Sequence, residues 1–363
     1  MTIDGGRALA WLAAEPRPAG GEAEARVRAR CAEELRALGC EVAERPFEYS
    51  ALPGRWSTPA AGVVSIAGLC GVAALAADGA TASAAAVALA ALAAVGAGGA
   101  WAARRGVLAL PLLRRRGVNL EARRGHPRVW LVAHLDSKSQ PVPMLARAAG
   151  VVLSVTVWAT AIALLAAQWL GAPVDGWRWL AAAGVAAGLP VALSTVGSRS
   201  PGALDDASGV AAVLEAASRV APARPLGVLL TSAEELGLAG ARAWVAGRRP
   251  RDATDAVLNC DGVDDDGAIV AMWSGRAPDA LLASVAAAAA RAGVVVRPRR
   301  LIPGLLVDAV AFADAGWPAI TLSRGTLRTL ARIHRAADAA PPLRGTGVSV
   351  VAGVLAGCLE ANS

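Results

Sequence analysis

The chain has 363 residues, of which 55% are hydrophobic, and its mean hydropathy is +0.46. Soluble domains are roughly 45–50% apolar, so this composition argues against a protein that is soluble throughout. The formal net charge is +7, but no RNA- or DNA-binding motif is visible, and the five cysteines form no CxxC pair. We therefore expect neither a nucleic-acid partner nor a disulfide framework, and the cysteine pattern is compatible with a reducing compartment.

The first polar segment, residues 1–56, predicts a helix followed by a strand. In "GEAEARVRARCAEELRALG" the apolar residues Val27, Cys31 and Leu35 recur at helical spacing, and Gly39 marks the predicted end of the helix. The next stretch, "CEVAERPFEYS", predicts a strand. The segment begins without the basic start, apolar core and cleavage site of a signal peptide.

Four uncharged apolar stretches come next, in two pairs. They are Ser57 to Ala77, Gly79 to Ala103, Ala148 to Val174 and Trp179 to Ser198. A helix needs roughly 20 such residues to cross the ~30 Å hydrocarbon core of a membrane. We predict two transmembrane α-hairpins, at residues 57–103 and 148–198, and so four membrane helices. The alternative is a pair of buried alanine-rich hairpins in a soluble protein.

The other two polar segments, 104–147 and 199–363, predict an α/β fold. The former offers the strands "GVNLEAR" and "PRVWLVAHLDS". The latter alternates helices such as "GVAAVLEAASRVA" with buried strands such as "LGVLLTS", "DAVLNCD" and "PAITLS". Such alternation predicts a sheet with helices on both faces. We expect segments 1–56, 104–147 and 199–363 to form one catalytic domain that the two hairpins interrupt.

The arginine distribution predicts how this domain faces the membrane. Lys138 is the only lysine, and arginines cluster from Arg104 to Arg128, beside an apolar stretch. Anionic membrane lipids are therefore the expected partners. Two complete hairpins leave all polar segments on one side, where arginines flank the apolar stretches. The positive-inside rule then predicts an integral protein of the bacterial inner membrane, with the catalytic domain in the cytoplasm.

Polar residues occur in order where the predicted strands end. His134 and Asp136 end "VWLVAHLD", Glu234 and Glu235 follow "VLLTS", and Asp261 ends "AVLNCD". Asp205 and Asp206 precede a helix in "GALDDASG", and His334 lies in "RIHRAAD". Because ligands bind beyond the carboxyl ends of strands in open α/β sheets, these residues could converge. Imidazole and carboxylate ligands suit zinc or a similar divalent ion. The remaining histidine, His126, lies in a predicted surface turn.

At this point the sequence resembles family 28 of the metallopeptidases, the co-catalytic di-zinc aminopeptidases and their relatives such as glutamate carboxypeptidase. The resemblance rests on "GVNLEARRGHPRVWLVAHLDS", "GALDDASG", "TSAEELGLAG", "VDAVAFADAGWPAITLS" and "IHRAAD". It implies a zinc-peptidase-like mixed sheet flanked by helices. The chain departs from the family pattern at Val307-Asp308-Ala309, where "SDH" is frequent, and at Ile333, where tyrosine is frequent.

The resemblance also implies a role for each site residue. Asp205 would bridge two zinc ions, or similar divalent ions; His134 and Asp261 would complete one position, and Glu235 and His334 the other. Glu234 would act as general base on the metal-bridging water or hydroxide, and Asp136 would orient His134. A cis peptide bond would join Asp205 to Asp206.

The leading hypothesis is a membrane-embedded zinc aminopeptidase that hydrolyses the N-terminal peptide bonds of hydrophobic, lipidated or membrane-derived substrates. A second is an amidohydrolase that acts on an acylated or lipidic amide. A third is an inactive relative that serves as a scaffold, although such relatives lose metal ligands and this chain keeps all five.

Overall fold

The structure is a computed structural model, and it describes residues 2–250, 255–302, 304–341 and 343–361. The outer ends of the predicted segments 1–56 and 199–363 thus lie outside the described residues. The chain divides into two compact units. Unit 1 comprises residues 1–50, 113–139 and 198–363, and unit 2 comprises residues 51–112 and 140–197.

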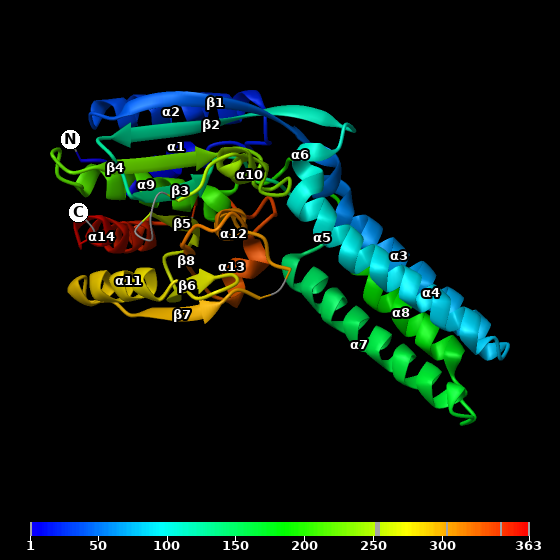
Figure 1. The fold of residues 1–363 in the computed structure, drawn as a ribbon. Coiled ribbons are helices and arrows are strands. Elements are labelled where there is room, and N and C mark those ends of the chain that lie inside the picture. The colour runs from blue at the N-terminus through cyan, green and yellow to red at the C-terminus, as the bar shows by residue number, and fades with distance from the viewer. Residues whose placement is uncertain (1, 251–254, 303, 342, 362–363) are drawn as a thin grey trace. The chain divides into compact units, whose positions relative to one another are not determined.

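Unit 1 is built on one eight-stranded mixed sheet with the strand order β1-β2-β4-β3-β5-β8-β6-β7. The central strands β4, β3, β5 and β8 are parallel, whereas β1, β2 and β6 run antiparallel to a neighbour. The prediction of a mixed sheet flanked by helices is confirmed (Figure 1). The strands are β1 (Glu41–Ser50), β2 (Arg114–Arg124), β3 (Val129–His134), β4 (Leu226–Thr231), β5 (Ala256–Val263), β6 (Ala268–Trp273), β7 (Val296–Arg300) and β8 (Ala319–Gly325).

Helices cover both faces of this sheet because successive side chains of each strand point to opposite faces. In β3, Leu131 and Ala133 join the larger core, and Val132 joins the smaller one. The larger core is closed by α1 (Gly5–Leu12), α2 (Glu22–Ala37), α9 (Ser208–Arg219), α11 (Asp279–Arg291) and α14 (Thr346–Ala361). The smaller core is closed by α10 (Ala239–Val245) and α12 (Asp308–Asp314).

Local sequence signals account for most of these elements. In α2 the predicted apolar positions Val27, Cys31 and Leu35 are all buried, and Gly39 follows the helix with a φ of 78°. Three elements were not predicted from the sequence: α1, β6 and α13 (Leu327–Arg332), which has only six residues. Helix α1 starts with two glycines, which are poor helix formers, and β6 is a six-residue strand without polar alternation.

Unit 2 consists of long apolar helices: α3 (Ala51–Ala77), the continuous stretch Thr81–Ala109, α7 (Met144–Trp169) and α8 (Trp177–Ala192). The stretch Thr81–Ala109 includes α4 (Thr81–Ala93), α5 (Gly99–Trp101) and α6 (Val107–Ala109), joined by the π-helical turns η1 (Ala94–Gly98) and η2 (Ala102–Gly106). α3 begins at Ala51 and α7 at Met144, so both helices start before the apolar stretches that predicted them.

By length and composition, three described helices can cross a membrane: α3, the stretch Thr81–Ala109, and α7. Four were predicted. Helix α8 has only 16 residues, which is about 24 Å at 1.5 Å per residue and short of the hydrocarbon core. It ends at Ala192 because Ser194, Thr195 and Gly197 follow, and these residues favour irregular backbone over helix.

Glycines allow α3 and α8 to pack closely in unit 2. A Cβ atom at Gly62 would lie 2.3 Å from the backbone nitrogen of Ala192, and one at Gly188 would lie 2.5 Å from Ile66. Polar side chains also connect helices of this unit. Trp158 Nε1 donates to Ser65 Oγ over 2.9 Å. Small residues and isolated polar contacts of this kind are typical of helices that associate within membranes.

Candidate metal centre

Four of the predicted site residues, three metal ligands and the general base Glu234, stand at the carboxyl edge of the central parallel strands of unit 1. His134 is the last residue of β3, Glu234 and Glu235 lie in the turn after β4, and Asp261 lies near the end of β5. Because these strands are parallel neighbours, their ends bring the side chains together.

The other two predicted ligands come from loops that reach the same edge. Asp205 lies in η3 (Ala203–Ala207), an irregular turn just before α9, where its φ is −126°. His334 follows α13 (Leu327–Arg332), and its φ is +64°. The peptide bond between Asp205 and Asp206 is cis, as the resemblance implied. The third histidine, His126, is exposed.

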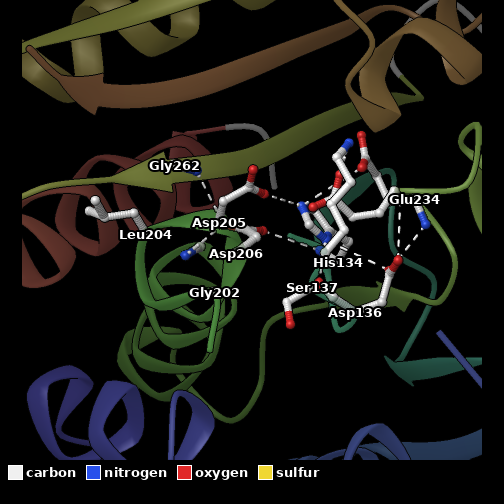
Figure 2. A network of polar contacts seen from close by, with 12 residues as sticks. His134, Asp136, Ser137, Gly202, Leu204, Asp205, Asp206, Glu234 and Gly262 are labelled. Atoms are coloured by element: carbon white, nitrogen blue, oxygen red, sulfur yellow. Dashed lines mark hydrogen bonds and ion pairs between the residues drawn. The ribbon is translucent and has the colours of Figure 1, made fainter. Parts of the chain in front are cut away.

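These side chains form two groups. Within each group, all potential ligand atoms lie within 4.8 Å of one another. One group is His134, Glu234 and Asp261, and the other is Asp205, Glu235 and His334. Asp205 connects them, because its Oδ1 lies 3.0 Å from His134 Nε2 and its Oδ2 lies 2.9 Å from His334 Nε2 (Figure 2). One carboxylate thus faces one histidine of each group.

The arrangement around His134 fits a cation. His134 Nδ1 must donate its hydrogen to the carbonyl oxygen of Asp136, 3.0 Å away, because a carbonyl can only accept. In the neutral ring this leaves Nε2 with a lone pair. Nε2 is buried, and although Asp205 Oδ1 lies nearby, the two atoms do not form a hydrogen bond. Glu235 Oε1 is likewise buried without a hydrogen-bond partner. Two facing lone pairs repel each other unless a cation lies between them.

The electrostatics of the site point the same way. Burial lowers the pKa of His134, but Glu234 and the nearby aspartates more than offset this and raise the pKa well above its ordinary value. The site therefore favours positive charge at this nitrogen. Metal binding to histidine replaces the proton on the same nitrogen. Nitrogen and oxygen donors of this kind suit zinc, so the residues present fit two divalent ions.

Comparison with known families agrees with this geometry. The sequence profile described as peptidase family M28 matches residues 174–356, just over half of the chain. The chain belongs to peptidase family M28. The match includes Asp205, Glu234, Glu235, Asp261 and His334, whereas His134 and Asp136 precede it. Membership makes the chain a zinc-dependent hydrolase and a metallopeptidase.

Solved structures similar to this M28 chain share its fold. An aminopeptidase from Aneurinibacillus sp. strain AM-1 aligns with a TM-score of 0.58 at 15% identity, covering 98% of this chain and 92% of that one. A zinc aminopeptidase from Bacillus subtilis aligns at 0.56 and 14% identity, covering 98% and 94%. A glutaminyl cyclase from Fimbriiglobus ruber aligns at 0.56 and 16% identity, covering 99% and 96%. None of the curated proteins matches the sequence.

Asp136 does more in this M28 chain than orient a histidine. Its main-chain carbonyl accepts the hydrogen bond from His134, and its carboxylate lies 3.7 Å from the same ring nitrogen. The two carboxylate oxygens accept hydrogen bonds from the backbone N–H groups of Glu234 and Glu235, at 3.1 and 3.2 Å (Figure 2). Asp136 thus joins the end of β3 to the turn that carries both glutamates.

Asp206 ties three elements together behind Asp205. Its carboxylate accepts hydrogen bonds from the backbone N–H groups of His134 (3.2 Å), Gly209 (3.0 Å) and Gly262 (3.2 Å). It is fully buried, and burial raises its pKa well above the ordinary value despite these bonds. The second aspartate of "GALDDASG" therefore has a positioning role.

Sequence reasoning missed two further residues that position the ligands. Arg17 is buried, and its guanidinium donates to the carbonyl oxygens of Leu135 (2.8 Å), Pro201 (2.6 Å) and Gly202 (3.1 Å). It therefore clamps the two chain segments that carry His134 and Asp205. Every residue offers a carbonyl, so no sequence pattern could have revealed these partners.

Asp338 is the second residue that the sequence analysis left without a role. It accepts hydrogen bonds from the backbone N–H groups of Leu204, at 2.7 Å, and Asp205, at 3.3 Å. Burial raises its pKa to about 7. Asp338 lies four residues after His334 in the same loop, so it couples the loops of two ligands. Its place in "IHRAAD" was the available signal.

The carboxyl groups of the site differ in proton affinity. Burial raises the pKa of Glu234 well above its ordinary value and that of Asp261 to about 7. Burial alone would also raise the pKa of Asp205, but His134 and His334 lower it well below that value. Burial therefore strengthens the hold of Glu234 on a proton, whereas the two histidines favour the charged form of Asp205.

Proposed function

We propose that this M28 chain is an aminopeptidase in which Asp205 bridges two zinc ions. His134 and Asp261 would complete one position, and Glu235 and His334 the other. The contact of each Asp205 oxygen with a different histidine carries this assignment. When bound, the two ions would supply Lewis acidity that polarises the scissile carbonyl and makes water more acidic.

Glu234 is the proposed general base and not a ligand. Its Oε2 lies 4.0 Å from His134 Nε2, so it faces the same space as the ligands. Burial raises its pKa, which suits a group that must accept and release a proton near neutral pH. Glu234 would take a proton from the attacking water and deliver one to the leaving amine.

The preference for a free amino terminus is proposed from the chemistry of the site and from the fold. Glu234, which the assignment leaves without a metal ion, faces the same space as the ligands, and its carboxylate can attract a substrate's α-ammonium group. Two similar solved structures are of aminopeptidases, although a likeness of fold alone does not specify activity.

A substrate screen tests the proposed reaction. The protein is purified in detergent with zinc, its metal content is measured, and aminoacyl anilides are compared with their N-acylated counterparts. We expect about two zinc ions per chain and turnover of the free-amine series only. Turnover of the N-acylated series alone would establish the amidohydrolase alternative, and hydrolysis of neither series would contradict both.

Unit 2 is proposed to anchor the enzyme in a bacterial inner membrane, with unit 1 in the cytoplasm. The three long apolar helices support membrane insertion. Arg104, Arg105 and Arg147 flank the apolar stretches on the side that leads to unit 1, which supports the orientation. The expected partners on this side are anionic lipids.

Cysteine labelling tests the orientation. A cysteine replaces Asp78, in the exposed turn after α3, in a background that carries Cys70→Ala. We expect an impermeant thiol reagent to label it in spheroplasts, because this turn would lie outside. A matched cysteine at exposed Glu33, in α2, should react only after lysis. The opposite labelling pattern would reverse the orientation.

The proposed substrates are apolar or lipidated peptides that arrive from the membrane. The chain leaves unit 1 after Ser139 and returns at Ser198, so both ends of the second hairpin are connected through short segments to His134 and Asp205. A matched series of peptides that differ only in acyl-chain length is assayed in lipid nanodiscs. We expect kcat/KM to rise with chain length, and a constant value would leave only an anchoring role for unit 2.

A further inference from the structure

Lys138 is the single lysine of a chain with 36 lysines and arginines in total. At an exposed position an arginine supplies the same charge, and every other cationic side chain here apart from histidine is an arginine. Lys138, the exception, lies two residues after Asp136, at the metal centre. A lysine carries a compact ammonium, whereas an arginine carries a planar fork that can bind both oxygens of a carboxylate. The position therefore calls for the ammonium in particular.

The ammonium of Lys138 contacts a proposed zinc ligand. Its Nζ forms an ion pair with Glu235 Oε2, and the two side chains are only 17% and 4% exposed. The other oxygen, Oε1, faces His334 Nε2 over 3.4 Å and has no hydrogen-bond partner. The two oxygens of Glu235 are thus divided, one toward Lys138 and one toward the metal position.

The backbone on both sides of Lys138 is held in place. Ser137 Oγ accepts a hydrogen bond from the backbone N–H of Arg17 and donates to the carbonyl of Ser200, each over 2.9 Å. Ser139 Oγ accepts from the backbone N–H of Arg199, also over 2.9 Å. Because its neighbours are fixed, the backbone of Lys138 stays where its ammonium can reach Glu235.

We propose that Lys138 competes with the metal ion for Glu235, so that the Glu235–His334 position binds zinc more weakly than the His134–Asp261 position. A positive charge beside a buried carboxylate repels a second cation and already satisfies one ligand oxygen. This inference rests on the proposed ligand assignment. It predicts an enzyme whose second zinc ion exchanges readily while the first remains bound.

Zinc titration of the metal-free protein against a chromophoric chelator tests the proposal. We expect two unequal binding steps in the wild type, and His334→Ala should abolish the weaker one. Lys138→Met and Lys138→Gln should tighten the weaker step by at least ~10-fold, because each removes the repelling charge. Lys138→Arg should weaken it further, because a guanidinium can bind both oxygens of Glu235. Arg297→Met, which removes an exposed charge in β7, is the matched control and should change neither step.

Two equal steps in the wild type would overturn the proposal. So would a weaker step that is unchanged or loosened in both Lys138→Met and Lys138→Gln, which would make Lys138 a positioning residue for Glu235. Absence of zinc binding would overturn it together with the ligand assignment. If zinc binds in two steps but no peptide is hydrolysed, the proposed reaction is contradicted. The comparison of the Lys138 variants with the wild type still tests the role of Lys138.

Discussion

The interiors of the two units differ in what they bury. Unit 1 buries His134, Asp136, Asp206 and Glu234 at the edge of its sheet, whereas the described helices of unit 2 bury no charged side chain. Burying a charge is costly unless it is paired or hydrogen-bonded. In unit 1 the buried charges are stabilised by backbone N–H groups, by Arg17 and by a metal site. In unit 2 the backbone polar groups form hydrogen bonds within their own helices.

The comparison shows that polar burial in unit 1 is concentrated where chemistry takes place. Asp136 and Asp206 bond to backbone groups of the same turns that carry the ligands. In unit 2 the contact between Trp158 and Ser65 joins α7 to α3. Changes in unit 1 should therefore affect catalysis and zinc binding, whereas changes in the packing of unit 2 should leave zinc binding intact.

The largest expected effect is that of Asp205→Asn. An amide removes the charge and one of the two oxygens that face His134 and His334. Peptidase activity should fall by more than the ~10²–10⁴-fold expected for loss of a general base, and less than the full zinc content should remain. Activity assays and metal analysis check this result. Full zinc content with near-normal activity would show that Asp205 is not a bridging ligand.

Glu234→Gln should separate catalysis from metal binding. We expect zinc content to stay at the wild-type level and turnover to fall by ~10²–10⁴-fold, because the amide cannot accept the proton. Glu235→Gln is the matched control, since the neighbouring side chain is a proposed ligand and its change should lower zinc content. Equal zinc loss in both variants would make Glu234 a ligand.

The pH dependence of stability should change in Glu24→Gln. Glu24 is buried, and burial, followed by the nearby Asp136, raises its pKa to about 7 from an ordinary value of 4.5. The folded state therefore holds this proton more tightly than the unfolded state. The resulting stabilisation is complete below pH 4.5 and disappears as the pH rises through 7.

Relative to Glu24→Gln, the wild type should therefore lose about 2–3 kcal/mol of unfolding free energy between pH 5 and pH 8. Urea unfolding of both proteins in the same detergent, at both pH values, measures the difference. Parallel pH profiles for the two proteins would show that Glu24 is charged in the folded state at pH 5.

The smallest expected effect lies in unit 2. Gly62→Ala should cost about 1–3 kcal/mol, because its Cβ would lie 2.3 Å from the backbone nitrogen of Ala192 and backbone cannot move aside easily. Gly96→Ala is the matched control, since no atom lies within 4 Å of its Cβ position. Thermal unfolding in detergent should show a lower Tm for Gly62→Ala alone, with zinc content unchanged in both. Zinc loss in Gly62→Ala would contradict the separation between the two units.

Several features were predictable because they repeat a simple pattern. Polar residues that follow buried apolar runs marked His134, Glu234, Glu235 and Asp261 as a group, since parallel strands align their carboxyl ends. The helical spacing of apolar residues located α2, and long uncharged stretches located α3 and α7. The predicted α8 was too long at its carboxyl end. The uncharged stretch continues to Ser198, whereas the helix ends at Ala192, before Ser194 and Thr195.

The sequence by itself therefore determined which residue types meet at the sheet edge, the family resemblance and the apolar character of unit 2. Only the tertiary structure decided how Arg17 clamps two ligand segments, that Asp136 holds both glutamates through their backbone, and that Lys138 takes one oxygen of Glu235. The reason is physical. Periodicity and composition record whether a side chain is apolar. Hydrogen bonds to backbone groups, and the contacts of one carboxylate with two cations, depend instead on positions in space. Distant segments of the chain reach these positions only after folding.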